Sequence, residues 1–455
     1  MDKALFDYFR CPETYGDFAG CKEPSGPAGY FRFGPAIAYG QLTGGLCAES
    51  AAVRLHDSME DVEVSQSRLS LPFDPNTVVD NLRFERYVDA SISDRHNGTL
   101  KALTRNVYYS VRPALPVFVR KFMQQMSLRG WERRPFPKWP VDRSVEHISR
   151  RLLALCMRAK GVDRIPFIWF WPEDYTACTI MTHDVETSVG VSFVPSMMDL
   201  EDSYGVKSSF QIIPEGRYRA PKSLLNQIRT RGCEVNVHDL NHDGHLFRER
   251  GEFGRRLKKI NDYRRDFEAL GFRSGVLYRN LEWYDDLEFD YDMSVPNVGH
   301  LDPQPGGCCT VMPYFIGKVL ELPLTTIQDY SLFHILGDYS IELWKKQIAL
   351  VLEENGLLSF NIHPDYVIPS RARRVYMELL EYLRELRSKE GIWMALPCEV
   401  NRWWRQRAEM KLVARGKSWE IEGPGKERAR IAYAVRDGED VRYSFPEKIA
   451  DVLAV

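Results

Sequence analysis

The middle of the chain alternates between short apolar runs and longer segments whose apolar residues recur every three or four positions. The longer segments, several of them ended by glycine, predict helices over residues 144–160, 195–204, 221–231, 252–270, 341–354 and 371–388. The short runs predict strands over residues 179–182, 208–213, 234–237, 320–322, 357–362 and 392–396. Because parallel strands need crossover connections, this alternation predicts a mainly parallel sheet. We therefore expect an α/β, barrel-like domain with its chemistry at the carboxyl ends of the strands.

The pattern is different on both sides of this region. The start of the chain is rich in turn formers and has only a weak hydrophobic period. After about residue 410 the apolar stretches become short and are separated by glycine and proline, and Asp437-Gly438 is a hairpin signal. A chain of 455 residues is also long for one domain. We expect an N-terminal region of unknown function over 1–160, the α/β domain over 161–405, and a small antiparallel β appendage over 406–455.

The overall charge gives no reason to expect nucleic acid as a partner, since 61 Lys and Arg stand against 63 Asp and Glu. One basic stretch does occur, because residues 111–160 hold twelve Lys and Arg and three acidic residues. It has two interpretations. It is a surface for an anionic membrane or a lipid-linked glycan, or it is a connector whose arginines are solvated and whose aromatic residues pack on the next domain. The second is favoured.

Compartment is predicted from three further observations. No run of about 18 apolar residues occurs, so no ordinary transmembrane helix is expected. The first residues lack the basic start and apolar stretch of a secretory signal, which predicts a cytoplasmic protein. Nine widely scattered cysteines do not resemble a disulfide framework and are expected to be mostly buried thiols.

Two of the predicted strands end in residues that suit a metal site. Asp184 and Glu186 follow the first strand, and residues two apart in an extended segment point the same way. Two carboxylates together favour a metal ion or a shared proton. His238 and His242 follow a later strand, and imidazole combined with carboxylate suits zinc or a similar divalent ion. The alternatives are a polar loop and a solvated histidine cluster.

Two further strand ends carry an arginine and a histidine. Arg273 lies on a strand edge, where a guanidinium group beside a carboxylate keeps that carboxylate ionised. His363 ends the apolar strand over 357–362. Taken singly, such an arginine is usually a surface residue and such a histidine is usually structural. The two residues become informative only together with the acidic and histidine motifs.

The order of these motifs resembles a known family. An Asp-x-acid motif is followed about fifty residues later by His-x-x-x-His, then by an arginine before Tyr291-Asp292-Met293-Ser294, then by a strand that ends in histidine. Over about residues 165–400 this is similar to the polysaccharide deacetylases, the NodB-homology carbohydrate esterases. The resemblance implies a distorted (β/α) barrel that removes acetyl groups from N-acetylated sugars with one divalent metal ion. Three differences stand out: Val185 replaces the second aspartate of the usual first motif, Arg273 is followed by Ser-Gly and not by the usual proline-containing turn, and no Asp-Trp motif occurs between Asp292 and His363.

The resemblance also implies a role for each motif residue. Asp184 corresponds to the general base, Arg273 to the residue that orients and charge-pairs with the base, and His363 to the general acid. The implied metal ligands are Glu186, His238 and His242. The implied ion is zinc, with cobalt or nickel as alternatives.

We therefore expect a metal-dependent hydrolase that deacetylates a nucleotide- or lipid-linked amino sugar in bacterial surface polysaccharide biosynthesis. Two alternatives stay open: a non-catalytic glycan-binding or assembly protein on a degenerate barrel, and a hydrolase of a non-sugar amide. A phosphate-binding loop, a dinucleotide glycine fingerprint and a His-Glu-x-x-His motif are all missing from the sequence. Kinase, dehydrogenase and metalloprotease functions therefore have no support.

Overall fold

The computed structural model describes residues 3–15, 24–65, 68–88, 128, 130–416 and 418–445. Its centre is a nine-stranded sheet with the order β11-β12-β10-β9-β8-β7-β6-β13, and β14 also pairs with β6. The strands are β6 Ala177–Val185, β7 Ser209–Ile212, β8 Glu234–His238, β9 Gly271–Arg273, β10 Tyr291–Asp292, β11 Tyr314–Ile316, β12 Val319–Glu321, β13 Leu357–Asn361 and β14 Ile392–Ala395. All pairings except β11–β12 are parallel. The predicted α/β fold with a mainly parallel sheet is confirmed.

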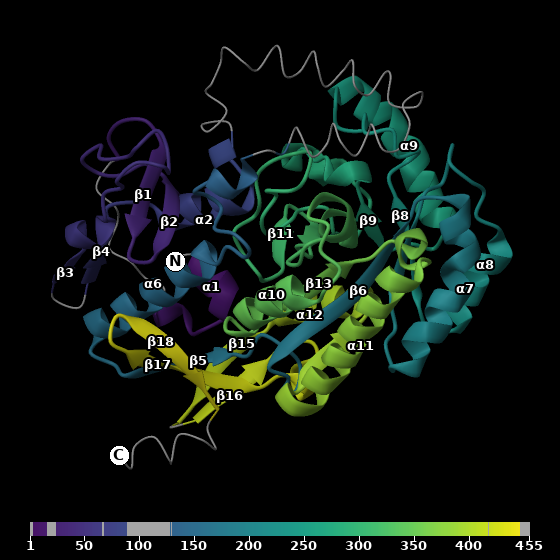
Figure 1. Ribbon diagram of the computed structural model, residues 1–455. Coiled ribbons are helices and arrows are strands. Elements are labelled where there is room, and N and C mark those ends of the chain that lie inside the picture. The colour runs from purple at the N-terminus through teal and green to yellow at the C-terminus, as the bar shows by residue number, and fades with distance from the viewer. Residues whose placement is uncertain are drawn as a thin grey trace.

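Helices connect many of these strands, and one more helix follows the last of them. They are α7 Ser188–Ser203, α8 Lys222–Thr230, α9 Arg250–Asp266, α10 Glu342–Leu352, α11 Ser370–Glu390 and α12 Pro397–Glu409. Figure 1 shows α7, α8 and α9 on one side of the molecule. The predicted start of α7 at residue 195 is wrong. Thr187 caps the helix by accepting a hydrogen bond from the Gly190 N–H at 3.0 Å, and Pro195 lies inside the helix.

The sheet curls as a half-barrel, and side chains bridge the gap between its two ends. The segment that follows β12 lies along β13. The Thr325 hydroxyl donates to the carbonyl of Leu357 at 2.7 Å and accepts the Ser359 N–H at 3.0 Å, and the Thr326 hydroxyl donates to the carbonyl of Ser359 at 2.7 Å. These contacts place the next residues of the segment, 328 and 329, at the carboxyl end of β13.

The N-terminal region consists of short elements around one long helix. These are α1 Lys3–Phe9, β1 Gly29–Phe33, β2 Ala36–Gly40, β3 Glu63–Ser65, β4 Arg68–Ser70, α2 Pro75–Arg83 and α6 Ser144–Lys160. The strands β1–β4 lie on the side of the molecule away from α7 and α8 (Figure 1). Helix α6 has the predicted bounds, and Gly161 ends it with a φ of 62°.

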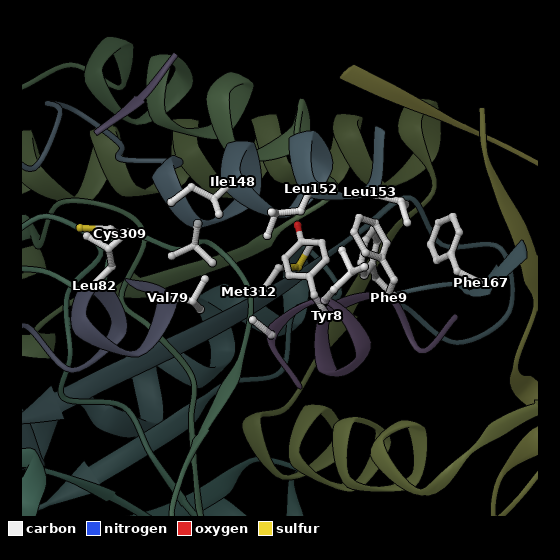
Figure 2. Close-up of a cluster of buried hydrophobic side chains, with 14 of the residues drawn as sticks. Tyr8, Phe9, Val79, Leu82, Ile148, Leu152, Leu153, Phe167, Cys309 and Met312 are labelled. Carbon is white, nitrogen blue, oxygen red and sulfur yellow. The ribbon is translucent and has the colours of Figure 1, made fainter. Parts of the chain in front are cut away.

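The N-terminal region and the α/β domain share one hydrophobic core. Figure 2 shows part of this cluster. Its labelled side chains are Tyr8 and Phe9 of α1, Val79 and Leu82 of α2, Ile148, Leu152 and Leu153 of α6, and Phe167, Cys309 and Met312 of the following domain. The N-terminal region is therefore packed into the α/β domain.

Two antiparallel hairpins follow α12, as the sequence predicts. They are β15 Lys411–Arg415 with β16 Ser418–Glu422, and β17 Ile431–Asp437 with β18 Asp440–Ser444. Strand β17 also pairs with β5 Arg164–Ile168, so the second hairpin extends a strand at the start of the α/β domain.

Part of the basic stretch 111–160 lies outside the described residues, namely 111–127 and 129. Within its described part, the rings of Trp131 and Trp139 pack against each other and against His300. Among the described residues no helix is long and apolar enough to cross a membrane. The eight described cysteines are all free thiols, and six of them are buried.

Candidate active site

The predicted acidic motif lies at the carboxyl end of β6. The Asp184 carboxylate is buried and accepts hydrogen bonds from the Arg273 guanidinium at 3.0 Å and from the Asn361 amide at 2.7 Å. Burial alone would raise the pKa of Asp184, but Arg273, His238 and His363 outweigh it and lower this pKa to about 2. Asp184 is therefore a buried carboxylate that stays ionised.

Arg273 is held in place from several sides. It is fully buried at the end of β9. Besides Asp184, it donates to the Thr182 hydroxyl at 2.9 Å and to the carbonyl of Met293 at 2.9 Å. The guanidinium group therefore has little freedom to move away from Asp184.

Glu186, His238 and His242 form a cluster of possible metal ligands. One ligand atom from each lies within 4.8 Å of the other two. The Nε2 atoms of both histidines are buried, and both face the same Glu186 oxygen, at 2.9 Å from His242 and 3.9 Å from His238. Nδ1 of His238 lies 3.1 Å from the carbonyl of Arg273, which favours the tautomer with a free lone pair on Nε2. Two imidazoles and one carboxylate with an open side suit a catalytic zinc ion, so these residues fit a divalent metal.

The turn after β8 brings the two histidines together. Asp239 and His242 adopt left-handed backbone conformations with φ of 56° and 55°. The loop after β9 packs closely against this turn. A Cβ atom at Gly275 would lie 2.4 Å from an Asp239 carboxylate oxygen and 3.2 Å from Cα of His242. Glycine at position 275 is therefore required by this close approach.

Arg217 contacts the same cluster and was not predicted from the sequence. Its NH2 group lies 3.0 Å from Nδ1 of His242 and donates to the carbonyl of His242 at 3.0 Å. Its NH1 group lies 3.7 Å from a Glu186 oxygen. Because a guanidinium group can only donate, Nδ1 of His242 is the acceptor here and Nε2 carries the proton. A metal ion on Nε2 therefore requires Arg217 to turn away.

His363 has a buried carboxylate partner that the sequence analysis missed. Nδ1 of His363 lies 2.7 Å from one Asp329 oxygen, and the His363 N–H donates to the other at 2.8 Å. Nε2 of His363 is 3.5 Å from Glu186. Burial would lower the pKa of His363, but Asp329 and Glu186 raise it well above the ordinary value. The only sequence signal for Asp329 is that an aromatic residue, Tyr330, follows it. Asp338 before Tyr339 shows the same pattern, so the sequence alone could not tell which aspartate is the partner of His363.

These residues line a cavity of about 100 Å³. From the predicted set, the lining includes Asp184, Glu186, His242 and His363. The other lining residues are Val276, Leu277, Leu301, Asp302, Pro303, Gln328, Tyr330, Ser331 and Tyr366. All six residues that the sequence singled out therefore lie in or directly behind one cavity, because Arg273 contacts Asp184 and His238 lies 3.7 Å from it.

No family model and no curated protein matches the chain. Its structure is similar to that of a protein assigned as a polysaccharide deacetylase from Mycobacterium smegmatis, with 18% identity and a TM-score of 0.43, over 52% of this chain and 93% of that one. It is also similar to the peptidoglycan deacetylase PdaC from Bacillus subtilis, with 15% identity and a TM-score of 0.30, over 51% and 94% of the two chains. A third, from Bordetella bronchiseptica, is assigned as a polysaccharide deacetylase involved in O-antigen biosynthesis, with 17% identity and a TM-score of 0.32, over 50% and 84%.

Proposed function

We propose that the chain is a metal-dependent hydrolase that removes the acetyl group from an N-acetylated amino sugar. The observation that carries this proposal is the cavity in which an ionised carboxylate, Asp184, and a cationic imidazole, His363, accompany a buried cluster of three possible metal ligands. Hydrolysis of an amide needs a base for the attacking water and an acid for the departing amine, and this cavity offers both.

Glu186, His238 and His242 are the proposed ligands of one divalent ion, with zinc preferred and cobalt or nickel as alternatives. When bound, such an ion polarises the amide carbonyl and makes a water molecule more acidic. The buried Nε2 atoms of the two histidines support this assignment, because both are directed at the same Glu186 oxygen.

Asp184 is the proposed general base. Its carboxylate lines the cavity and remains ionised because Arg273 pairs with it. It can therefore accept the proton that the attacking water loses. Arg273 and Asn361 fix the direction of the carboxylate, since each donates to a different oxygen.

His363 is the proposed general acid. Asp329 binds Nδ1, so the proton on Nε2 faces the cavity and Glu186. The raised pKa of His363 keeps the ring cationic near neutral pH. It can then give a proton to the amine as the carbon–nitrogen bond breaks, which prevents expulsion of water from the same centre.

The substrate proposed in detail is an amino sugar carried on a nucleotide or a lipid, used in bacterial surface polysaccharide biosynthesis in the cytoplasm. The motif resemblance supports the sugar. An anionic carrier corresponds to the less favoured interpretation of the basic stretch 111–160, in which its lysines and arginines attract phosphate groups.

The test combines metal analysis with acetate release. The purified protein is assayed with N-acetylated nucleotide sugars, lipid-linked sugars and non-sugar amides. We expect one divalent ion per chain and acetate from a sugar, and we expect Asp184→Asn and His363→Ala to lose about 10² to 10⁴ in rate while they keep the ion. His245→Ala, which changes a third histidine three residues after His242, is the matched control. This variant should keep both the bound ion and the rate of acetate release.

Each other outcome favours a specific alternative. A bound ion without hydrolysis of any amide supports the non-catalytic glycan-binding protein. Hydrolysis of non-sugar amides alone supports the other hydrolase. Full activity of Asp184→Asn and His363→Ala contradicts the assigned roles.

A further inference from the structure

Two loops form a part of the cavity that the proposed chemistry does not use. The loop after β9 contributes Val276 and Leu277, and the loop after β10 contributes Leu301, Asp302 and Pro303. Val276 and Leu277 have φ of 62° and 55°. Residues other than glycine rarely adopt this left-handed backbone conformation. The surrounding structure must therefore hold the first loop in place.

Gln304 fastens the two loops to each other. Its side-chain oxygen accepts the Arg279 N–H at 3.0 Å, and its side-chain nitrogen donates to the carbonyl of Arg279 at 3.1 Å. The backbone of the first loop is thereby tied to a side chain of the second, two residues after Asp302.

The N-terminal region fastens both loops through Glu85, just after α2. One carboxylate oxygen lies 2.6 Å from Nε of Arg279, and the other binds the NH2 group of Arg279 and accepts the Gly307 N–H at 2.5 Å. Glu85 and Arg279 are both buried, which makes this two-pronged ion pair a strong constraint. The Tyr87 hydroxyl adds a bond to the carbonyl of Gly307 at 2.6 Å. Residues 85–87 thus hold the cavity wall.

Asp302 is the charged group that this wall presents to the cavity. Its Oδ1 accepts a hydrogen bond from the Gln328 side chain at 3.1 Å. The Gln328 oxygen in turn accepts from the Asn361 amide at 3.1 Å, so the direction of the Gln328 side chain is fixed. The described residues provide no hydrogen bond to Oδ2 of Asp302. Burial raises the pKa of this carboxyl to about 6, against the effect of Arg279, so it is ionised at neutral pH.

An ionised carboxylate can only accept hydrogen bonds, so its ligand must bring a donor. The neighbouring side chains Val276, Leu277, Leu301 and Pro303 are apolar. A pyranose ring matches both features, because its hydroxyl groups can donate to the carboxylate and its C–H groups can pack against the apolar side chains. A phosphate group is disfavoured here because it would repel Asp302.

We propose that Asp302 is a substrate-binding residue whose Oδ2 accepts a hydrogen bond from a hydroxyl group of the amino sugar, and that Glu85 positions it through Arg279 and Gln304. This proposal rests on the function proposed above, because it assigns the sugar-binding part of the same cavity. It also places the carrier phosphate of a nucleotide- or lipid-linked substrate away from this wall.

The test measures binding by calorimetry on the zinc-loaded protein. The ligands are N-acetylated monosaccharides and analogues that each lack one hydroxyl. We expect the wild type to lose about tenfold in affinity for one analogue, and we expect Asp302→Ala to bind that analogue and its parent sugar equally. Glu85→Gln should lower the affinity for the parent sugar by a similar factor. Glu354→Gln, which breaks a buried ion pair with Arg150 outside the cavity lining, is the matched control and should keep the wild-type affinity.

Acetate release by the same variants separates the two proposals. Wild-type affinity of Asp302→Ala for every ligand overturns the assignment of Asp302, even if acetate release stays normal. Sugar binding that depends on Asp302 without acetate release overturns the hydrolase and supports the binding residue. If the wild type binds none of these monosaccharides, the assignment of Asp302 is wrong, and acetate release from the nucleotide- and lipid-linked sugars decides on the hydrolase separately. If Glu354→Gln weakens binding as much as Glu85→Gln does, Glu85 acts only through general stability and its positioning role is wrong.

Discussion

Asp329 holds His363 at two points, since one carboxylate oxygen lies 2.7 Å from Nδ1 of the ring and the other accepts the backbone N–H at 2.8 Å. The pair comes from two segments that run side by side, β13 and the segment after β12. Against the effect of burial, Asp329 raises the pKa of His363. Asp329 therefore contributes both to the positive charge of the proposed acid and to the direction of its ring.

Replacing Asp329 by asparagine should move the alkaline limb of activity. In the Asp329→Asn variant the side chain keeps its shape but loses the negative charge that raises the pKa of His363. The His363 ring therefore loses its proton at a lower pH. We expect the rate at neutral pH to fall about a hundredfold and the alkaline limb of the pH–rate profile to shift downward. An unchanged alkaline limb would assign that limb to another group.

The same pair should make stability depend on pH. The folded pKa of His363 lies above its unfolded value of about 6.5. Its contribution to the free energy of unfolding is therefore complete below about pH 6.5 and is lost as pH rises through the folded pKa. Urea unfolding of metal-free wild type and Asp329→Asn should differ most below that pH, and a constant difference would contradict the linkage.

Replacing Arg273 by glutamine should act at the opposite end of the pH scale. Burial raises the pKa of Asp184, and Arg273 is the first of the charges that oppose it. In Arg273→Gln this pKa rises, so the base is protonated at acid pH and the acidic limb of kcat moves upward. Asp184 contributes stability above its unfolded pKa of about 3.9, and this contribution disappears as pH falls toward 2.

Arg273→Lys is the matched variant for this prediction. It keeps the positive charge but loses the hydrogen bonds that the guanidinium group of Arg273 donates to the Thr182 hydroxyl and the Met293 carbonyl. We expect its acidic limb to stay closer to that of the wild type. Equal shifts in both variants would show that geometry rather than charge sets the pKa of Asp184.

Replacing Arg217 by glutamine should strengthen metal binding. Arg217 occupies Nδ1 of His242 and places a positive charge beside Glu186. Its removal frees the tautomer that ligation needs, and we expect zinc affinity to rise about tenfold, which corresponds to about 1.4 kcal/mol. Competition with a chromophoric chelator measures this change. Weaker zinc binding in the variant would mean that Arg217 orients His242 for the ion.

Adding a methyl group at Gly275 should disturb the histidine turn. The new Cβ would lie 2.4 Å from an Asp239 oxygen, so the turn that carries His242 must shift. We expect Gly275→Ala to lose about 1 to 3 kcal/mol of stability and to bind zinc more weakly. Gly254→Ala is the control, because Gly254 lies in α9 with open space around it and alanine favours a helix. Normal zinc affinity in Gly275→Ala would contradict the required close approach.

The sequence predicted the parts of the site that lie directly at strand ends. Asp184, His238 and His363 each follow an apolar run, and parallel strands present their carboxyl ends at one edge of the sheet. The strands β9, β10 and β11 have only two or three residues, too few to show a period. Pattern alone could therefore not establish where Arg273 lies relative to the base.

The remaining residues come from segments without a period. Asp329 reaches His363 because Thr325 and Thr326 align an irregular segment with β13 through their side chains, and local sequence does not encode that alignment. Arg217 and Glu85 come from a loop and from the end of a short helix. Such contacts over long sequence separations depend on the completed tertiary structure.

The hydrophobic core that joins the first 160 residues to the α/β half also limits how the molecule can be divided. A fragment that begins near residue 161 would expose the aromatic surface around Phe167 to water and would lose Glu85 as well. The two halves should therefore melt in a single cooperative transition, and neither half should be exchangeable between relatives without the other.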